Sequence, residues 1–265
     1  MITAGVDMGS RTIKVVLLAD GRVVARVLGT AGFDPAPAAR ALYEKALGEA
    51  GLDPGGVAHV TATGGGRELV EFASSRITEI TAAARAAHHL FPGATTVVDV
   101  GAEESRAIKT DGRGRVLDAA VNDKCAAGSG IFTESMARAL GMSLEEFARR
   151  STESTARISM NAQCTVFAES EVVSLIHAGV DRKDIARAVH DAIASRVGAM
   201  VRRIRLEEPV VLIGGLARNA GFVKSLKENL QVDSFRIPED PVGAVALGAA
   251  LIAAGRAAVQ EGKAA

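Results

Sequence analysis

The chain has 265 residues, of which 48% are hydrophobic and 23% are charged, and its formal net charge is zero. This length allows two modest lobes with a real core, and the lack of a net positive charge argues against nucleic acid or an anionic membrane as a partner. Two cysteines and no signal peptide predict a protein of the reducing cytoplasm, and the longest apolar run, residues 242–254, is too short to span a bilayer.

The opening of the chain predicts a β-hairpin. Residues 2–18 form two β-rich runs separated by a tight turn at Gly9-Ser10, and Asp20-Gly21 then predicts a second turn into a third strand. The periodicity that follows predicts, in order, a helix over 35–50, a strand over 57–63 ending at three glycines, and a mostly helical region over 69–90.

The opening pattern returns about 90 residues later. Residues 96–109 again run from strand to aspartate, small turn and strand, with Asp99 matching Asp7 and Gly101 matching Gly9. Each copy continues into an Asp-Gly turn and a further strand. A repeat of this kind predicts an internally duplicated two-lobe fold.

The second half of the chain is predicted to be mainly helical. Its apolar periodicity and capping patterns predict helices over 130–140, 143–150 and 181–205, a strand over 210–213, and two last helices that begin at about 221 and 242.

The two cysteines stand in similar settings. Cys125 lies in the stretch Asn-Asp-Lys-Cys-Ala-Ala-Gly-Ser-Gly, Cys164 lies in Asn-Ala-Gln-Cys-Thr-Val-Phe-Ala-Glu, and each precedes a segment with helical periodicity. A helix N-terminus favours a thiolate, so both positions suit an anionic cluster. A [4Fe–4S] centre usually takes four thiolates, which a two-fold dimer would supply. The alternative is two buried cysteines that act as small hydrophobes.

The two hairpins and a third, glycine-rich segment are candidates for a nucleotide cleft. The backbone N–H groups of such a turn can face a phosphate, and an aspartate at the strand end can hold Mg²⁺ through water. At Gly214-Gly215 the missing side chains allow a flat ring close to the backbone. A single Asp-x-Gly turn is common and can be an ordinary turn, but two in one chain are stronger evidence. No Gly-Lys-Ser/Thr motif occurs, so a P-loop is excluded.

Three segments of the chain resemble the nucleotide-binding segments of the actin/Hsp70/hexokinase-type ATPases. The two phosphate segments correspond to Val6–Ser10 and Val98–Gly101, and the adenosine segment corresponds to Gly214-Gly215. The two cysteine segments narrow the resemblance to the BadF/BadG/BcrA/BcrD family, which includes activators of 2-hydroxyacyl-CoA dehydratases and ATPase subunits of benzoyl-CoA reductases. The resemblance covers nearly the whole chain. It implies an α/β fold of two duplicated lobes, residues 1–92 and 93–265, with an ATP cleft between them.

The resemblance also implies an activity and its cofactors. Two subunits, a homodimer or a pair of related chains, would share one [4Fe–4S] cluster held by Cys125 and Cys164 of each. ATP binding and hydrolysis would drive a low-potential electron, received from ferredoxin or flavodoxin, into an iron–sulfur partner enzyme acting on a CoA ester.

The family's site residues carry over to both hairpins and the adenosine segment. Asp7, Asp99 and Glu103 take catalytic roles, with Asp7 also holding Mg²⁺ through water. The residues expected to bind ATP or ADP are Gly9, Ser10, Arg11, Thr12, Lys14, Gly101, Ala102, Gly214, Gly215 and Asn219.

The second phosphate segment departs from the family pattern. Dehydratase activators usually read Asp-Ile-Gly-Gly-Gln-Asp there, and this chain reads Asp-Val-Gly-Ala-Glu-Glu over residues 99–104. The change leaves open which group positions the attacking water. Together with the residues before Cys164, it favours the benzoyl-CoA reductase type of subunit.

Two other functions are compatible with the fold. A small-metabolite kinase needs a catalytic carboxylate that faces a sugar or acid pocket, and no segment clearly offers one. A kinase also gives no reason for the cysteine pair. A non-enzymatic assembly protein of the actin fold would polymerise with ATP and hold no iron.

Overall fold

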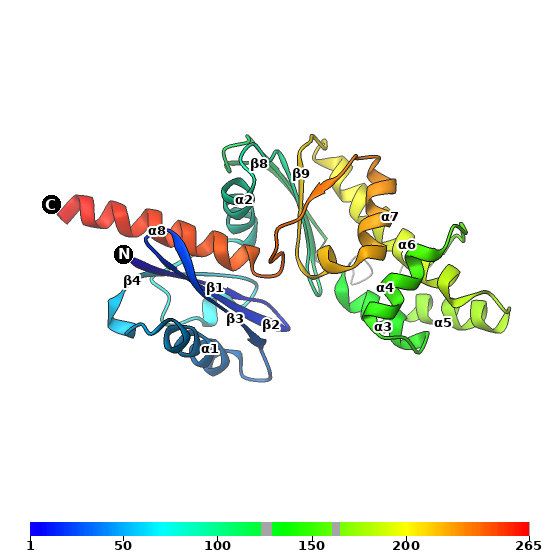
Figure 1. The fold of residues 1–265 in the computed structure, drawn as a ribbon, viewed down its shortest axis with the longest axis horizontal. Coiled ribbons are helices and arrows are strands. Elements are labelled where there is room, and N and C mark those ends of the chain that lie inside the picture. Colours follow the sequence, from blue (N-terminus) through cyan, green and yellow to red (C-terminus); the bar gives the residue numbers. More distant parts are fainter. Residues whose placement is uncertain (123–128, 161–164, 265) are drawn as a thin grey trace. The chain divides into compact units, whose positions relative to one another are not determined.

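The computed structural model describes residues 1–122, 129–160 and 165–264 (Figure 1). Both cysteines, Cys125 and Cys164, therefore lie outside the described residues. The chain divides into two compact units, which we describe one at a time. The first contains Met1–Ala94, Thr110–Val116 and Val242–Ala265, and the second contains Thr95–Lys109 and Leu117–Pro241.

The first unit is built on a five-stranded mixed sheet. Its strand order is β3-β2-β1-β4-β5, with β1 antiparallel to β2 and parallel to β4. The strands are β1 (Ile2–Met8), β2 (Thr12–Ala19), β3 (Arg22–Thr30), β4 (Val57–Thr63) and β5 (Ser75–Arg76). Because β1 is central and covered on both faces, all of its residues after Ile2 are buried.

Helices cover both faces of this sheet. One face packs against α1 (Pro35–Ala50), through Ala39, Tyr43 and Leu47. The other face packs against α8 (Ala244–Ala264), which in turn contacts α2 (Glu79–Leu90). A Cβ at Gly5 would lie 2.0 Å from the carbonyl oxygen of Ala246, so only glycine allows α8 this close to β1. Two short 3₁₀ turns, η1 (Pro54–Gly56) and η2 (Arg67–Leu69), complete the unit.

The second unit repeats this arrangement. Its sheet has the order β10-β9-β6-β7-β8, with β6 antiparallel to β7 and parallel to β9. The strands are β6 (Thr96–Val100), β7 (Ser105–Thr110), β8 (Val116–Asn122), β9 (Val210–Ile213) and β10 (Phe235–Arg236). The order matches that of the first sheet strand for strand, which confirms the predicted duplication and the α/β class.

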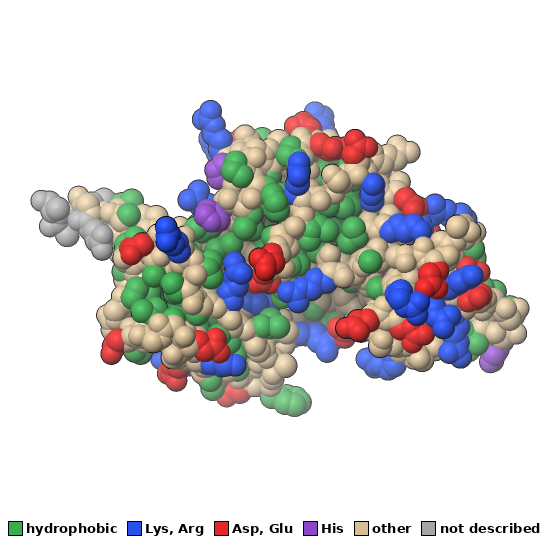
Figure 2. Space-filling view, in the orientation of Figure 1, with side chains coloured by type: hydrophobic (Ala, Val, Ile, Leu, Met, Phe, Trp, Pro, Cys, Tyr) green, Lys and Arg blue, Asp and Glu red, His purple; other side chains and the backbone are tan. Residues whose placement is uncertain are grey.

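The helices of the second unit surround one large core. They are α3 (Gly130–Ala139), α4 (Leu144–Glu153), α5 (Thr165–His177), α6 (Arg182–Arg203) and α7 (Ala220–Leu230), with a 3₁₀ turn η4 (Gly215–Arg218) after β9. Phe132, Phe147 and Phe222, from α3, α4 and α7, are fully buried in this core. Acidic and basic side chains are interspersed over these helices on the face seen in Figure 2. None of the helices described in either unit is both long and apolar enough to cross a membrane.

The observed division of the chain differs from the predicted boundary at residue 92. Residues 242–265 belong with the first unit because the apolar face of α8 packs against Val16 and Leu18 of β2, through Ala246, Leu247 and Ala250. The region over 69–90 also differs, since it starts at the last residue of η2 and contains the short strand β5 before α2 begins.

Candidate active site

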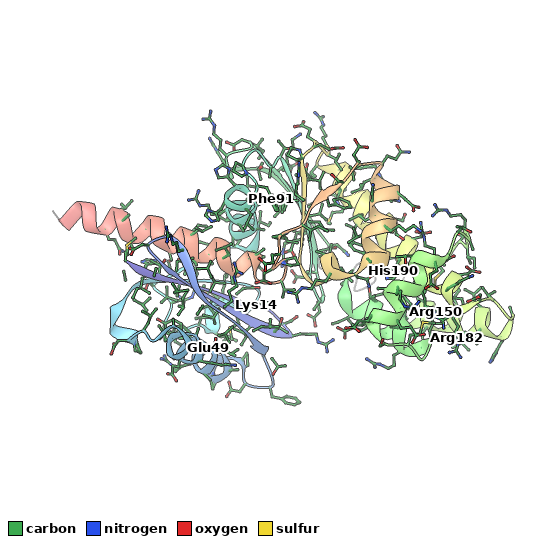
Figure 3. The ribbon with its side chains drawn as sticks, in the orientation of Figure 1. Lys14, Glu49, Phe91, Arg150, Arg182 and His190 are labelled. Carbon is green, nitrogen blue, oxygen red and sulfur yellow. The ribbon has the colours of Figure 1, made fainter. Side chains whose placement is uncertain are left out.

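The first hairpin carries a carboxylate and a cation directly opposite each other. Asp7 on β1 and Lys14 on β2 are cross-strand partners, and Lys14 Nζ lies 3.1 Å from Asp7 Oδ2. Only 9% of the Asp7 side chain and 16% of the Lys14 side chain are exposed. Figure 3 marks Lys14 on this sheet. Lys14, which is expected to bind a phosphate, is thus paired with Asp7. Its Nζ also lies 3.5 Å from the carbonyl oxygen of Thr12 in the same turn.

The turn between these strands is tight. Gly9 N donates to the carbonyl oxygen of Thr12 at 3.1 Å, which leaves Ser10 and Arg11 exposed at the tip. Beside the turn lies a cavity of about 280 Å³. Its lining comprises Met8, Gly9, Ser10, Ala31, Gly32, Pro35, Gly65 and Gly66. None of these side chains ionises.

The three glycines after β4 take part in this site, a role that sequence reasoning missed. Gly64 has φ +97°, and a Cβ there would lie 2.3 Å from the carbonyl oxygen of Met8. Gly66 N donates to that same oxygen at 2.9 Å. The glycine run therefore holds the end of β4 against the end of β1, and its position directly after a buried strand was the available signal.

The second hairpin repeats the charge pair. Asp99 and Arg106 are cross-strand partners, with Arg106 Nη1 3.2 Å from Asp99 Oδ2, and Arg106 also forms an ion pair with Glu104. Asp99 is buried, whereas Glu103 is exposed on the turn. Of the two glutamates that replace the family's amide and aspartate, Glu104 therefore has a structural partner and Glu103 faces solvent.

The turn of the second hairpin is bonded to the start of helix α3. Gly130 N donates to the carbonyl oxygen of Gly101, and Ile131 N donates to that of Ala102, each at 2.9 Å. The first N–H groups of a helix have no partner inside the helix, and here the hairpin turn accepts two of them. The turn and the beginning of α3 are therefore joined directly by two backbone hydrogen bonds.

The predicted adenosine segment lies against the same hairpin. Gly214 has φ +88° and ψ 178°, and a Cβ there would lie 2.4 Å from the carbonyl oxygen of Val100 and 2.7 Å from Asp99 Oδ1. Gly215 is exposed, with open space where a Cβ would be. Asn219 has a structural role that was not predicted, because its Oδ1 accepts a hydrogen bond from Phe222 N and caps α7.

The structure thus gathers the predicted residues into two groups. Asp7, Gly9, Ser10, Arg11, Thr12 and Lys14 lie together in the first unit, and Asp99, Gly101, Ala102, Glu103, Gly214, Gly215 and Asn219 belong to the second.

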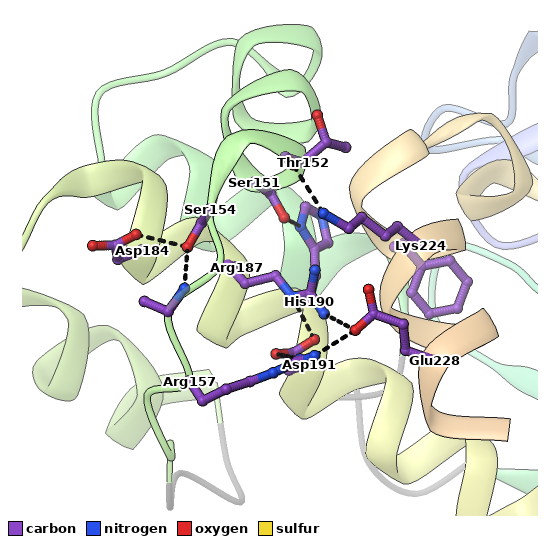
Figure 4. Close-up of polar contacts among 12 residues, drawn as sticks. Ser151, Thr152, Ser154, Arg157, Asp184, Arg187, His190, Asp191, Lys224 and Glu228 are labelled. Carbon is purple, nitrogen blue, oxygen red and sulfur yellow. Dashed lines mark hydrogen bonds and ion pairs between the residues drawn. The ribbon is translucent and has the colours of Figure 1, made fainter. Parts of the chain in front are cut away.

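A polar network around α6 was not predicted at all (Figure 4). Arg187 pairs with Asp191 and Glu228, and Arg157 pairs with the same two carboxylates, at 3.0 Å and 2.6 Å. The hydrogen bonds that Arg157 donates to Glu228 and, second in effect, to Asp191 raise the pKa of Arg157. Burial raises the pKa of Glu228, but the two arginines outweigh it and lower that pKa overall. The network attaches the segment after α4, which leads toward Cys164, to α6 and α7.

His190 lies beside this network. Its Nδ1 is 2.8 Å from Ser151 Oγ, and its ring packs against Phe147. Complete burial, assisted by the charge of Arg187, lowers the pKa of His190 to about 3, so the ring is neutral at physiological pH.

Comparison with known proteins agrees with this geometry. The model of the BadF/BadG/BcrA/BcrD ATPase family matches residues 4–253. The chain is 40% identical to an activator of lactoyl-CoA dehydratase from Anaerotignum propionicum, over 96% of this chain and 97% of that protein. It is 35% identical to a subunit of benzoyl-CoA reductase from Thauera aromatica, over 94% of this chain and 92% of that protein.

Solved structures agree as well. The activator of 2-hydroxyisocaproyl-CoA dehydratase from Clostridium difficile, determined with bound ADPNP, superimposes with a TM-score of 0.92 at 34% identity and covers 99% of this chain and 98% of that one. A hexokinase from Thermus thermophilus, with a TM-score of 0.53 and 19% identity, shares the fold alone. The matched family model and the identity along almost the whole length show that the chain belongs to the BadF/BadG/BcrA/BcrD ATPase family.

Proposed function

We propose that the chain is the ATP-driven electron activator of an iron–sulfur enzyme that acts on a CoA ester. The observation that carries this proposal is the pair of backbone hydrogen bonds between the second hairpin turn and α3. This helix begins five residues after Cys125. A nucleotide-dependent movement at Gly101 and Ala102 therefore has a short covalent and hydrogen-bonded path to a cluster ligand.

Each unit, taken by itself, offers groups suited to part of a nucleotide. In the first unit, backbone N–H groups of the Gly9–Thr12 turn can bind a phosphate. In the second unit, those of the Gly101 turn can do the same, and Gly215 leaves open space suited to an adenine ring. Lys14 can exchange Asp7 for a phosphate oxygen, because its ammonium already lies at the turn. Buried carboxylate oxygens at Asp7 and Asp99 suit Mg²⁺, which when bound supplies positive charge against the phosphates. Glu103, exposed on its turn, can orient the attacking water.

The cysteine pair suits a cluster shared by two chains. Helix α5 begins at Thr165, directly after Cys164, so the N–H groups of a helix start are available to stabilise a thiolate there. Cys125 and Cys164 from each of two subunits would hold one [4Fe–4S] cluster, which when bound stores the low-potential electron that ferredoxin or flavodoxin delivers. The second subunit is a copy of this chain or a related ATPase subunit.

The partner enzyme is a 2-hydroxyacyl-CoA dehydratase or a benzoyl-CoA reductase. The glutamates at 103 and 104 favoured the reductase type on sequence grounds. The higher identity to a dehydratase activator than to a reductase subunit favours the dehydratase type, and we propose that type.

The metabolite-kinase alternative has less support. The cavity beside the first hairpin has no ionisable side chain among its lining residues, so none of them can act as a general base toward the hydroxyl of a phosphate acceptor.

Protein purified without oxygen tests the proposal. We expect a broad visible absorption from thiolate-to-iron charge transfer and about four iron atoms per two chains. Cys164→Ser should lose the iron and still hydrolyse ATP, while Ala178→Ser, at the exposed residue after α5, should keep both. A protein that binds ATP but stays free of iron after anaerobic reconstitution would refute the electron-transfer function.

A further inference from the structure

Three polar side chains form a row across the first sheet. Lys14, Asp7 and Thr63 are in register on the adjacent strands β2, β1 and β4. Cross-strand partners project from the same face of a sheet, with their Cβ atoms close together. Asp7 and Thr63 also lie at the carboxyl ends of two parallel strands, which is the edge where ligands bind in α/β sheets.

The hydroxyl of Thr63 is buried without a partner. The residue is fully inaccessible, and its Oγ1 has no hydrogen-bond partner among the residues that the structure describes. Two residues earlier on the same face, Thr61 Oγ1 is equally buried but lies 2.9 Å from Ser75 Oγ. An unpaired buried hydroxyl is destabilising, and a valine of nearly the same shape would avoid that cost. A threonine at this position therefore indicates a use in another state of the site.

The surroundings of the row favour a negative charge. Thr3 Oγ1 contacts the carbonyl oxygen of Ala250, while Gly5 lies against Ala246, so α8 runs antiparallel to β1 over this face. The N-terminal end of α8 is accordingly directed toward the end of the face where Asp7 and Thr63 lie. The positive end of a helix dipole stabilises a nearby carboxylate.

From this arrangement we infer that Thr63 is a positioning residue for the Asp7 carboxylate during ATP hydrolysis, an inference that rests on the nucleotide site proposed above. In the structure Lys14 binds Asp7. When a phosphate at the Gly9–Thr12 turn attracts the ammonium, the Thr63 hydroxyl donates to the carboxylate and keeps it oriented.

The second unit lacks an equivalent of Thr63 beside its own aspartate. The residue in register with Asp99 on β9 is Ile213, which has no hydroxyl. Asp99 is held instead by Arg106, a cation with several donors that already engages two carboxylates. Of the two hairpins, only the first thus combines a lysine that pairs with its aspartate and an unpartnered threonine hydroxyl on the neighbouring strand.

Thr63→Val tests the inference, with Thr63→Ser as rescue and Thr61→Val as the matched control. Thr63→Val should leave the melting temperature of nucleotide-free protein unchanged or raise it by about 2–4 °C. It should slow ATP hydrolysis about 10- to 100-fold, as expected for a lost hydrogen bond to a charged group. It should also raise the Mg²⁺ concentration at which ATP half-maximally stabilises the protein. Thr63→Ser should restore both properties.

Thr61→Val should have the opposite effect, because it removes a hydrogen bond that is formed in the structure. It should lower the melting temperature and leave the rate of ATP hydrolysis per folded molecule normal. Normal hydrolysis and Mg²⁺ dependence in Thr63→Val, or a serine variant that resembles the valine variant, would overturn the inference. Both readouts are independent of iron and of any partner enzyme. An iron-free protein would therefore refute the proposed electron transfer and leave this test unaffected.

Discussion

The cations of the two hairpins differ in a way that matters for nucleotide binding. Lys14 is a compact charge on a flexible stem that pairs with Asp7, whereas the guanidinium of Arg106 binds Asp99 and Glu104 together. An arginine fork that holds two carboxylates is fixed in place, and a lysine can exchange one anion for another. We therefore expect Lys14 to move toward phosphate while Arg106 stays with its carboxylates.

Alanine at the adjacent positions Gly214 and Gly215 is predicted to impair different properties, stability at Gly214 and ATP binding at Gly215. Gly214 has a backbone conformation that is essentially restricted to glycine, and its Cβ would meet the backbone of Val100. Gly214→Ala should lower the free energy of unfolding by about 2–4 kcal/mol. Gly215→Ala enters open space, so it should change stability by less than about 0.5 kcal/mol and weaken ATP binding about tenfold by occupying the position of the adenine ring.

Urea unfolding and ATP titration of both variants check this prediction. Each variant serves as the control for the other, since they separate a folding role from a binding role. Unchanged ATP affinity in Gly215→Ala would place the adenosine elsewhere.

Sequence reasoning located both aspartates and both turns, but it did not find their partners. The sequence predicts Lys14 as a nucleotide ligand and does not identify Arg106 as a partner of Asp99. The pairing depends on the strand register, which the turn geometry and the buried face set together. Thr63 was missed for the same reason, because β4 joins β1 across more than fifty residues of chain.

At the scale of elements, α6 connects the parts of the second unit that precede and follow it. It contributes Arg187, His190 and Asp191 to contacts with Ser151 at the end of α4, with Arg157 and with Glu228 on α7. Gly221, near the start of α7, makes room for this, because a Cβ there would lie 2.7 Å from the His190 ring. Sequence periodicity predicted α6 to within two residues at each end, but its apolar stripe left out these polar side chains, whose partners are distant in sequence.

His190 should make the second unit sensitive to mild acid. Burial lowers its pKa from 6.5 to about 3 in the folded protein, so the unfolded chain takes up a proton first as the pH falls. The stabilisation is complete above pH 6.5 and declines from there toward pH 3. We expect on the order of 2 kcal/mol to be lost between pH 7.5 and pH 5 through this one group. Urea unfolding across that range measures the loss.

His190→Asn provides the comparison, since an amide keeps a polar group near Ser151 and does not titrate. It should be less stable at pH 7.5 and show a shallower decline. His177→Asn, at the exposed end of α5, should retain the full decline. The pKa of Glu228 is lowered from 4.5, so its contribution is lost only below that value and does not interfere. An unchanged decline in His190→Asn would assign the acid sensitivity to another group.

The two duplicated halves of the molecule differ most in the segment that connects the third and fourth strands of each unit. Between the third and fourth strands the first unit has residues 31–56 and a single α-helix, α1, whereas the second has residues 123–209 with α3 to α6 and both cysteines. The hairpins therefore occur twice, whereas the two cysteines and the helices that follow them in sequence occur only in the second half. Sequence repeats revealed the hairpins because they are local, but α8 was assigned to the wrong side of the division because its packing on the first sheet is long-range.

Under the proposed function, the bonds from the second hairpin turn to α3 should couple ATP hydrolysis to electron transfer. A Cβ at Gly130 would lie 3.3 Å from the carbonyl oxygen of Gly101 and 3.4 Å from Ala102 Cα, so alanine must push the turn away from the helix. Gly130→Ala should keep ATP hydrolysis within about twofold of wild type. Electrons delivered per ATP should fall about fivefold, which corresponds to roughly 1 kcal/mol of lost coupling.

Gly48→Ala, in open space on α1, is the matched control and should leave both rates unchanged. Stopped-flow reduction of the partner enzyme and phosphate release, measured on the same preparation, give the ratio directly. Equal losses in hydrolysis and electron delivery would mean that Gly130 supports the nucleotide site itself. If both rates stay at the wild-type level, the signal to Cys125 takes a route other than the bonded turn. A selective loss of delivery identifies these two hydrogen bonds as the link between the duplicated ATPase hairpins and the helix that follows Cys125 in the second half of the chain.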